Sequence, residues 1–83
     1  MAIEPQVALE IARFLVRRPT PEQIVAFHPS SEATDRFYDL IATERAGTIT
    51  EDERAELESC ITIEHMMRLV KAEAHLVLQQ QVS

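Results

Sequence analysis

The chain is predicted to be all-α, with three shorter helices packed against one long C-terminal helix in a helical-bundle dimer. Three observations favour this architecture: a helix-forming composition, clear signals for helix ends, and a long apolar stretch in the last third of the sequence. The 83 residues include one Gly and no Trp, and they are rich in Ala, Glu, Leu, Arg and Gln, which favour helix. This length supports a single helical domain, 1–83.

The first predicted helix covers about residues 5–17. Pro5 suits its first turn, where a missing backbone N–H costs nothing. Pro19 ends the helix, because a proline disfavours helical geometry at the preceding residue. The apolar side chains between the two prolines recur with helical spacing and form one stripe: Val7, Ile11, Phe14 and Leu15.

A second, short helix is predicted over about residues 21–28. Thr20 and Gln23 have the spacing of a capping box, and Pro29 ends the segment. The third predicted helix covers 31–46 and is capped by one of two adjacent serines, Ser30 or Ser31. Gly47 ends this helix, because glycine adopts the left-handed conformation without strain. The apolar face of the third helix contains Ala33, Phe37, Leu40 and Ile41, with Tyr38 at its edge.

The long helix is predicted over about residues 51–81. Thr50 caps it, and the acidic residues 51–53 stabilise it because they lie at the positive, N-terminal end of the helix dipole. At about 1.5 Å per residue this helix spans roughly 48 Å, whereas a compact domain of this size has a radius of gyration of about 12 Å. We therefore expect part of its apolar surface to meet another chain.

Apolar residues follow two lines along the long helix. The first line has the alternating spacing of three and four that is typical of coiled coils: Cys60, Ile63, Met67, Val70, Ala74 and Val77. The second line contains Ile61, Met66, Leu69 and Leu76. Together the lines cover more than half of the circumference, which indicates burial on more than one side. The predicted interface contains Cys60, Ile63, Met66, Met67, Val70, Ala74 and Val77.

The charge pattern bears on the class of partner. The net charge is −6, and it falls entirely in residues 31–83. An acidic chain is a poor binder of nucleic acid or anionic membrane. The one basic cluster is Arg13, Arg17 and Arg18. Ion pairs with i, i+4 spacing are expected on exposed helix faces: Glu32–Arg36, Arg54–Glu58 and Glu64–Arg68.

The residues that could support chemistry are few and far apart. The single Cys60 excludes an intramolecular disulfide framework; we expect a small buried hydrophobe, with a reactive thiol or intermolecular disulfide as the alternative. His65 and His75 lie about 15 Å apart along one helix, too far to bind one ion. One glycine cannot form a Gly-rich phosphate loop. We therefore predict no enzyme activity, metal or cofactor. Neither a membrane span nor a signal peptide is expected, which favours a cytoplasmic protein.

Residues 46–57 read A-G-T-I-T-E-D-E-R-A-E-L. This run resembles a phrase shared by small bacterial helical proteins, usually written G-T-L-T-x-E-E-x-x-E-L. In those proteins the phrase precedes a helix with a His or Leu pair and a Lys-Ala segment, which residues 63–74 match here. The resemblance covers about residues 30–78. Some longer relatives resemble antitoxins with an N-terminal ribbon-helix-helix DNA-binding segment, but residues 1–29 lack the alternating pattern of its strand.

Together these features predict a protein–protein interaction module. It forms a homodimer or binds a partner protein through the long apolar helix. The resemblance implies a specific version, an antitoxin-like inhibitor of a neighbouring toxin. In that version residues 60–78 contact the target and the acidic residues 51–58 meet a basic site. The alternative is a small helical DNA-binding transcriptional regulator, which would use the three arginines of the first 18 residues.

Overall fold

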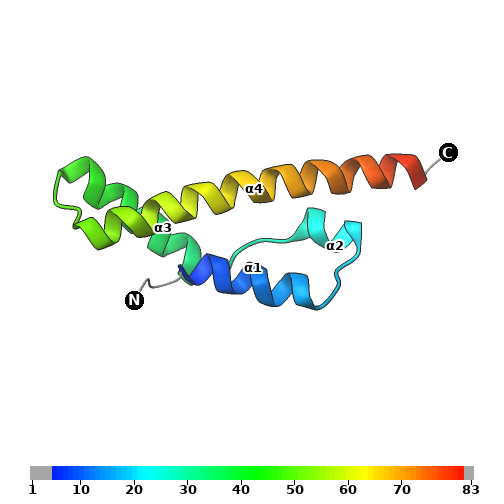
Figure 1. Ribbon diagram of the computed structural model, residues 1–83, viewed down its shortest axis with the longest axis horizontal. Helices are drawn as coiled ribbons and strands as arrows, with labels where there is room; N and C mark the ends of the chain where they lie inside the picture. The colour runs from blue at the N-terminus through cyan, green and yellow to red at the C-terminus, as the bar shows by residue number, and fades with distance from the viewer. Residues whose placement is uncertain (1–4, 82–83) are drawn as a thin grey trace.

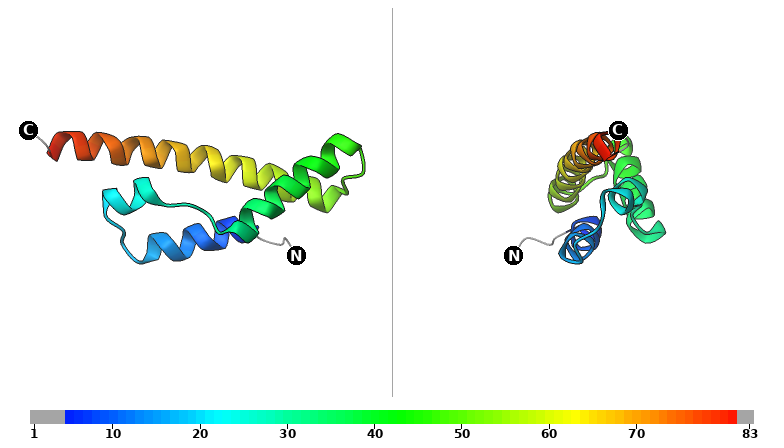
Figure 2. Two further views of the ribbon diagram at one scale, coloured as in Figure 1. Left: turned by 180° about the vertical axis from the view of Figure 1, so that it is seen from behind. Right: turned by 90° about the vertical axis from the view of Figure 1, so that its right-hand side faces the viewer.

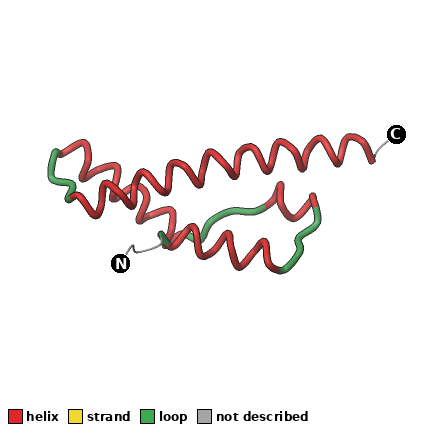
Figure 3. The backbone as a smooth tube through the Cα atoms, viewed as in Figure 1, coloured by secondary structure: helices red, strands yellow, loops and turns green. Residues whose placement is uncertain are grey.

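The computed structural model describes residues 5–81, and every regular element in that range is a helix (Figures 1 and 3). The first four residues, on which the expectation about a signal peptide rests, lie outside it. The helices are α1 (Gln6–Val16), α2 (Pro21–Ala26), α3 (Ser31–Ala46) and α4 (Glu51–Gln81). The prediction of three shorter helices packed against one long C-terminal helix is confirmed.

The long helix α4 is the common support of the fold. The helices α1, α2 and α3 all contact α4, and α1 also contacts α3. They lie on one side of α4, and its opposite side is bare (Figures 1 and 2). The molecule measures 52 × 24 × 20 Å, with a radius of gyration of 15.1 Å. This exceeds the value of about 12 Å for a compact domain of this length, so α4 is indeed longer than the rest of the chain can enclose.

The prolines set the helix ends within two residues of the predicted positions. Pro5 lies just before α1 rather than inside it, with φ −59° and ψ 147°. At the other end, Arg18 adopts a left-handed φ of 56° immediately before Pro19. The predicted second helix is two residues too long, because Phe27 is already extended, with φ −64° and ψ 135°. Its ring packs against Phe14 with a centroid distance of 4.6 Å, a long-range contact that local signals cannot reveal.

Side-chain caps begin the other three helices. Thr20 and Gln23 form the predicted capping box, with hydrogen bonds of 3.2 and 2.9 Å. Ser30, rather than its neighbour, caps α3 and accepts a first-turn backbone N–H at 3.1 Å. Thr50 and Glu53 form a second capping box at the start of α4, with hydrogen bonds of 2.9 and 3.1 Å. Each cap satisfies backbone donors that a helix start leaves unpaired.

The best-buried part of the core lies where α3 turns into α4. Leu40 is 1% exposed, Leu57 2% and Cys60 7%. The prediction that Cys60 is a small buried hydrophobe is therefore confirmed. Half-buried side chains from the neighbouring segments pack against this cluster: Val7, Phe37, Ile41 and Ile49. The cluster fixes the angle between α3 and α4, and with it the position of the rest of α4.

Gly47 allows the chain to turn from α3 into α4, and its replacement tests this turn. It has a left-handed φ of 74°, and nothing lies within 4 Å of the place where a Cβ would be. Gly47→Ala should therefore cost only backbone strain, about 1 kcal/mol of unfolding free energy. Urea denaturation followed by circular dichroism measures this loss of unfolding free energy. Gly47→Asn is the matched control and should lose less, because Asn tolerates this conformation better. A Gly47→Ala protein as stable as wild type would contradict the prediction.

Candidate functional site

The inner face of α4 completes the core of its own chain. Its buried residues are Leu57, Cys60, Met67 and Ala74, all at most 8% exposed. They recur with spacings of three and seven, so they stay on one side of the helix. This side faces α1, α2 and α3. The inner face is therefore occupied without any second chain.

The outer face of α4 carries large apolar side chains that no other part of the described chain covers. Met66 is 58% exposed, Leu69 53% and Leu76 50%, with Ile61 at 52% and Val77 at 39% on the flanks. At 100° per residue, Leu69 lies about 180° around the helix from Cys60. We call these five residues the outer face. Exposed apolar residues gathered on one side of a helix are typical of interaction surfaces.

The seven predicted interface residues do not share one free surface. Cys60, Met67 and Ala74 are buried in the chain's own core, Ile63 and Val70 are half-buried, and Met66 and Val77 are exposed. The reason is geometric: positions 63, 70 and 77 lie about 60° around the helix from positions 60, 67 and 74. The predicted seam thus runs along the edge of the intramolecular packing. The second predicted line, with Leu69 and Leu76, is the one that faces outward.

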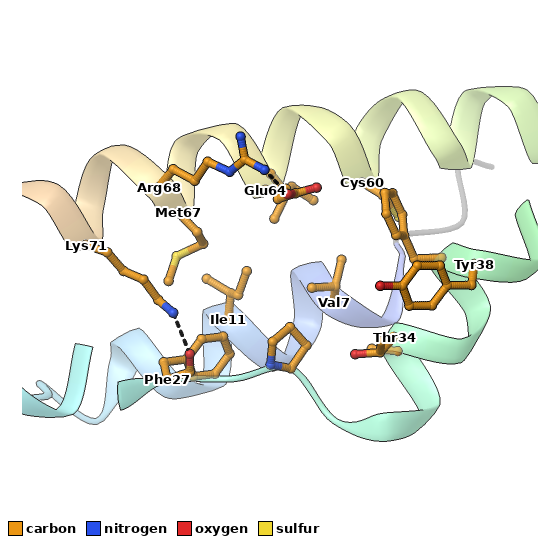
Figure 4. Close-up of a pocket in the computed structure, with 14 residues that line it drawn as sticks. Val7, Ile11, Phe27, Thr34, Tyr38, Cys60, Glu64, Met67, Arg68 and Lys71 are labelled. Carbon is orange, nitrogen blue, oxygen red and sulfur yellow. Dashed lines mark hydrogen bonds and ion pairs between the residues drawn. The ribbon is translucent and has the colours of Figure 1, made fainter. Parts of the chain in front are cut away.

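An apolar cavity of about 370 Å³ lies between α1, α3 and α4 (Figure 4). Val7 and Ile11 from α1 face Met67 across it, and Phe27 closes its base. Its volume falls within the range of small-molecule sites, roughly 300–1,000 Å³. Such sites also need a few polar groups that point inward to orient a ligand.

The charged groups around this cavity are already engaged with the protein. Arg68 forms a 2.7 Å ion pair with Glu64, as predicted from their spacing. The Lys71 ammonium group donates a 2.7 Å hydrogen bond to the carbonyl oxygen of Phe27. Across residues 5–81 no buried side-chain N or O atom lacks a partner. The charged groups of the cavity are thus engaged with the protein, and the hydroxyl-bearing side chains of Thr34 and Tyr38 also line it.

A polar network holds α1 against the start of α3 and so supports the cavity wall. The Glu10 carboxylate accepts a 2.8 Å hydrogen bond from the backbone N–H of Ser30 and a second from its hydroxyl group. Gln6 donates to the same carboxylate at 2.9 Å. These hydrogen bonds, chiefly those from Ser30, hold the pKa of Glu10 below its ordinary value of 4.5.

Two of the three predicted i, i+4 ion pairs are wrong. Arg36 turns away from Glu32 and binds Glu56 on α4 through two hydrogen bonds of 2.9 and 2.8 Å. The bidentate ion pair with Glu56 matches the planar guanidinium group better than a single hydrogen bond to Glu32 on the same helix would. It raises the pKa of Arg36 and lowers that of Glu56. The side chains of Arg54 and Glu58 remain exposed and form no ion pair with each other.

The groups considered for chemistry remain apart. Burial raises the pKa of the Cys60 thiol, and the nearby Glu56 carboxylate adds to this. A raised pKa keeps the sulfur in its unreactive thiol form. His65 and His75 are both exposed. Among the described residues there is no group of three or more His, Cys, Asp or Glu side chains that could bind a metal ion. Likewise, no helix in that range has the apolar length needed to cross a membrane.

The basic cluster does not belong to a helix-turn-helix. Arg13, Arg17 and Arg18 are exposed around the end of α1. The consecutive helices α2 and α3 each pack on α4 and do not contact each other. A helix-turn-helix needs these helices packed together, so that the second can enter the major groove.

No protein-family model, curated protein or solved structure matches the chain.

The network around Glu10 should make stability depend on pH. Because the folded-state pKa of Glu10 is lowered, its contribution is present above the ordinary value of 4.5 and is lost as pH falls through the folded pKa. Glu10→Gln should therefore be less stable than wild type at pH 7, and the difference should shrink at pH 3. Urea denaturation at both pH values measures this. Glu44→Gln, which alters an exposed carboxylate elsewhere, is the control. A difference that does not change with pH would contradict the assignment.

Proposed function

We propose that this protein is a protein–protein interaction module that binds a helix of another chain through the outer face of α4. One observation carries the proposal: α4 completes its own core with one side and still exposes five large apolar side chains on the other. Covering such side chains is favourable by about 25 cal/mol for each Å² of apolar surface removed from water. A straight apolar stripe with helical spacing best fits another helix laid along it.

The start of α4 supports a more specific version of the proposal. Glu51, Asp52 and Glu58 are exposed at this end of the helix, where the nearby Arg36 is already paired with Glu56. An acidic surface next to an apolar stripe suits a partner with a basic site, because complementary charge speeds and orients binding. An antitoxin-like inhibitor of a basic toxin, acting in the cytoplasm, is the version that combines both features.

The proposal is tested by photo-crosslinking in cells. A photoreactive phenylalanine analogue placed at Leu69 should form a covalent adduct with whatever covers the outer face. The same analogue at Ala42, which is exposed on α3, is the control and should form none. An adduct of twice the chain mass of 9.4 kDa identifies a second copy, and any other mass identifies a different protein. Equal labelling at both positions, or none at Leu69, would overturn the proposal.

Charge insertion separates the two faces of α4. Met67 is 8% exposed and Leu69 is 53% exposed. Met67→Glu places an unpaired charge in the core and should cost about 3–5 kcal/mol of unfolding free energy, enough to unfold much of a small domain. Leu69→Glu should change stability by no more than about 0.5 kcal/mol and abolish the adduct formed from a photoreactive residue at Leu76. Circular dichroism and gel mobility measure the two effects. A Leu69→Glu protein that still forms the adduct would contradict the assignment of the outer face.

A further inference from the structure

We infer that the occupant of the outer face is a second copy of this chain, with the two α4 helices parallel and in register. The inference rests on the proposed function and names its partner. Two independent features of α4 lead to it: the heptad pattern of the outer face, and the placement of opposite charges on the two flanks of that face.

The heptad pattern is defined by the residues that point away from the core. Leu69 and Leu76 are seven apart and take position a, and Ala72 between them takes position d. The buried residues Met67 and Ala74 then fall at position f, which points away from the partner helix in a coiled coil. One assignment thus accounts for both faces of α4. The a and d positions from Ala55 to Gln79 are Ala55, Glu58, Thr62, His65, Leu69, Ala72, Leu76 and Gln79.

The charges on the flanks favour a parallel arrangement. Arg68 takes position g and Glu73 takes position e; both are exposed, and the Arg68 side chain is 75% exposed. In a parallel pair, each g residue lies beside the e residue of the other chain that follows five positions later. Arg68 of each copy therefore meets Glu73 of the other, and two-fold symmetry forms this ion pair twice. Arg68 can keep its bond to Glu64, because a guanidinium group has five N–H donors.

An antiparallel pair offers no such match. In that arrangement g residues face g residues, and e residues face e residues. The g positions from residue 54 onward are Arg54, Ile61, Arg68 and His75, and the e positions are Ser59, Met66, Glu73 and Gln80. Arg68 would then meet no acidic side chain, and Glu73 would meet no basic one. Of the two orientations, only the parallel one therefore brings Arg68 and Glu73 together.

The same pattern indicates a dimer of modest strength. Glu58, His65 and Gln79 occupy d positions where an apolar residue would pack better, and polar residues at these positions lower coiled-coil stability. The apolar contact is concentrated between Met66 and Leu76. We therefore expect a dimer that dissociates on dilution and exchanges its partner readily.

The orientation is tested by a cysteine at Gln79. In the parallel pair the two residues at this d position lie close enough for a disulfide bond. In an antiparallel pair centred on Leu69 they would lie roughly 30 Å apart. Under mild oxidation Gln79→Cys should form a covalent dimer on a non-reducing gel. Gln81→Cys, at the f position on the side of α4 away from the partner helix, is the matched control and should form little. The wild-type protein is the control for a disulfide bond through the native Cys60, which is buried.

The ion pair is tested by exchanging its charges. Glu73→Arg leaves the Arg68–Glu64 bond intact and turns both contacts between chains into repulsion. The dissociation constant of the dimer should therefore rise roughly tenfold. Arg68→Glu should act in the same direction. The double variant Arg68→Glu/Glu73→Arg restores opposite charges and should recover most of the affinity. Sedimentation equilibrium over a hundredfold concentration range measures all three proteins.

The outcomes separate this inference from the proposed function. A covalent dimer at position 79 with recovery in the double variant supports the parallel pair. A dimer whose affinity is unchanged by both single charge variants overturns the parallel arrangement. Equal crosslinking at positions 79 and 81 overturns it as well. A wild-type protein that stays monomeric at every concentration, with an adduct of another mass at Leu69, overturns the self-association while the interaction module stands. The absence of any adduct overturns both.

Discussion

The packing of α4 against its own chain is the contact on which the rest of the structure depends, because each of the other helices is held by it. At 6 residues, α2 is too short to be stable alone, and it is fixed to α4 by apolar contacts and by the Lys71–Phe27 hydrogen bond. α3 is fixed by the Leu40–Leu57–Cys60 cluster and by the Arg36–Glu56 pair. Yet three helices on one side of a fourth cannot cover its whole circumference. A bare outer face therefore follows from the architecture, and its apolar residues are the basis of the proposed interaction.

The elements predicted well from the sequence are those determined by neighbouring residues. The capping box at Thr20, the stop at Gly47 and the extent of α4 all depend on local backbone chemistry, and the structure confirms them. The features that the sequence could not predict are contacts between distant segments. Arg36 prefers Glu56, 20 residues away, over Glu32 on its own helix, and Glu10 binds Ser30, also 20 residues away. Nothing in the spacing of these residues identifies the partner before the helices are placed.

The candidate surface was predicted in part, for a similar reason. Periodicity showed that α4 is apolar on more than one side, and it separated two lines of residues. It could not decide which line faces the core, because both lines have helical spacing and similar hydrophobicity. Burial decides it: Leu57, Cys60, Met67 and Ala74 are taken by the chain's own helices. The alternation of three and four in the first line was a sign of helix packing, but that packing is largely intramolecular.

Because α4 has only one face free for binding, self-association and binding of another protein would exclude each other. The outer face is one surface, so a second copy and a different partner would compete for it. By mass action, a partner that packs better against Leu69 and Leu76 would draw the protein out of the proposed homodimer. The polar residues at the d positions would weaken the proposed homodimer and so make that exchange easier. The dimer would then be a storage form that shields the apolar stripe from water and from aggregation. The folded domain would be unchanged by the exchange, because the residues that stabilise it lie on the opposite side of the helix.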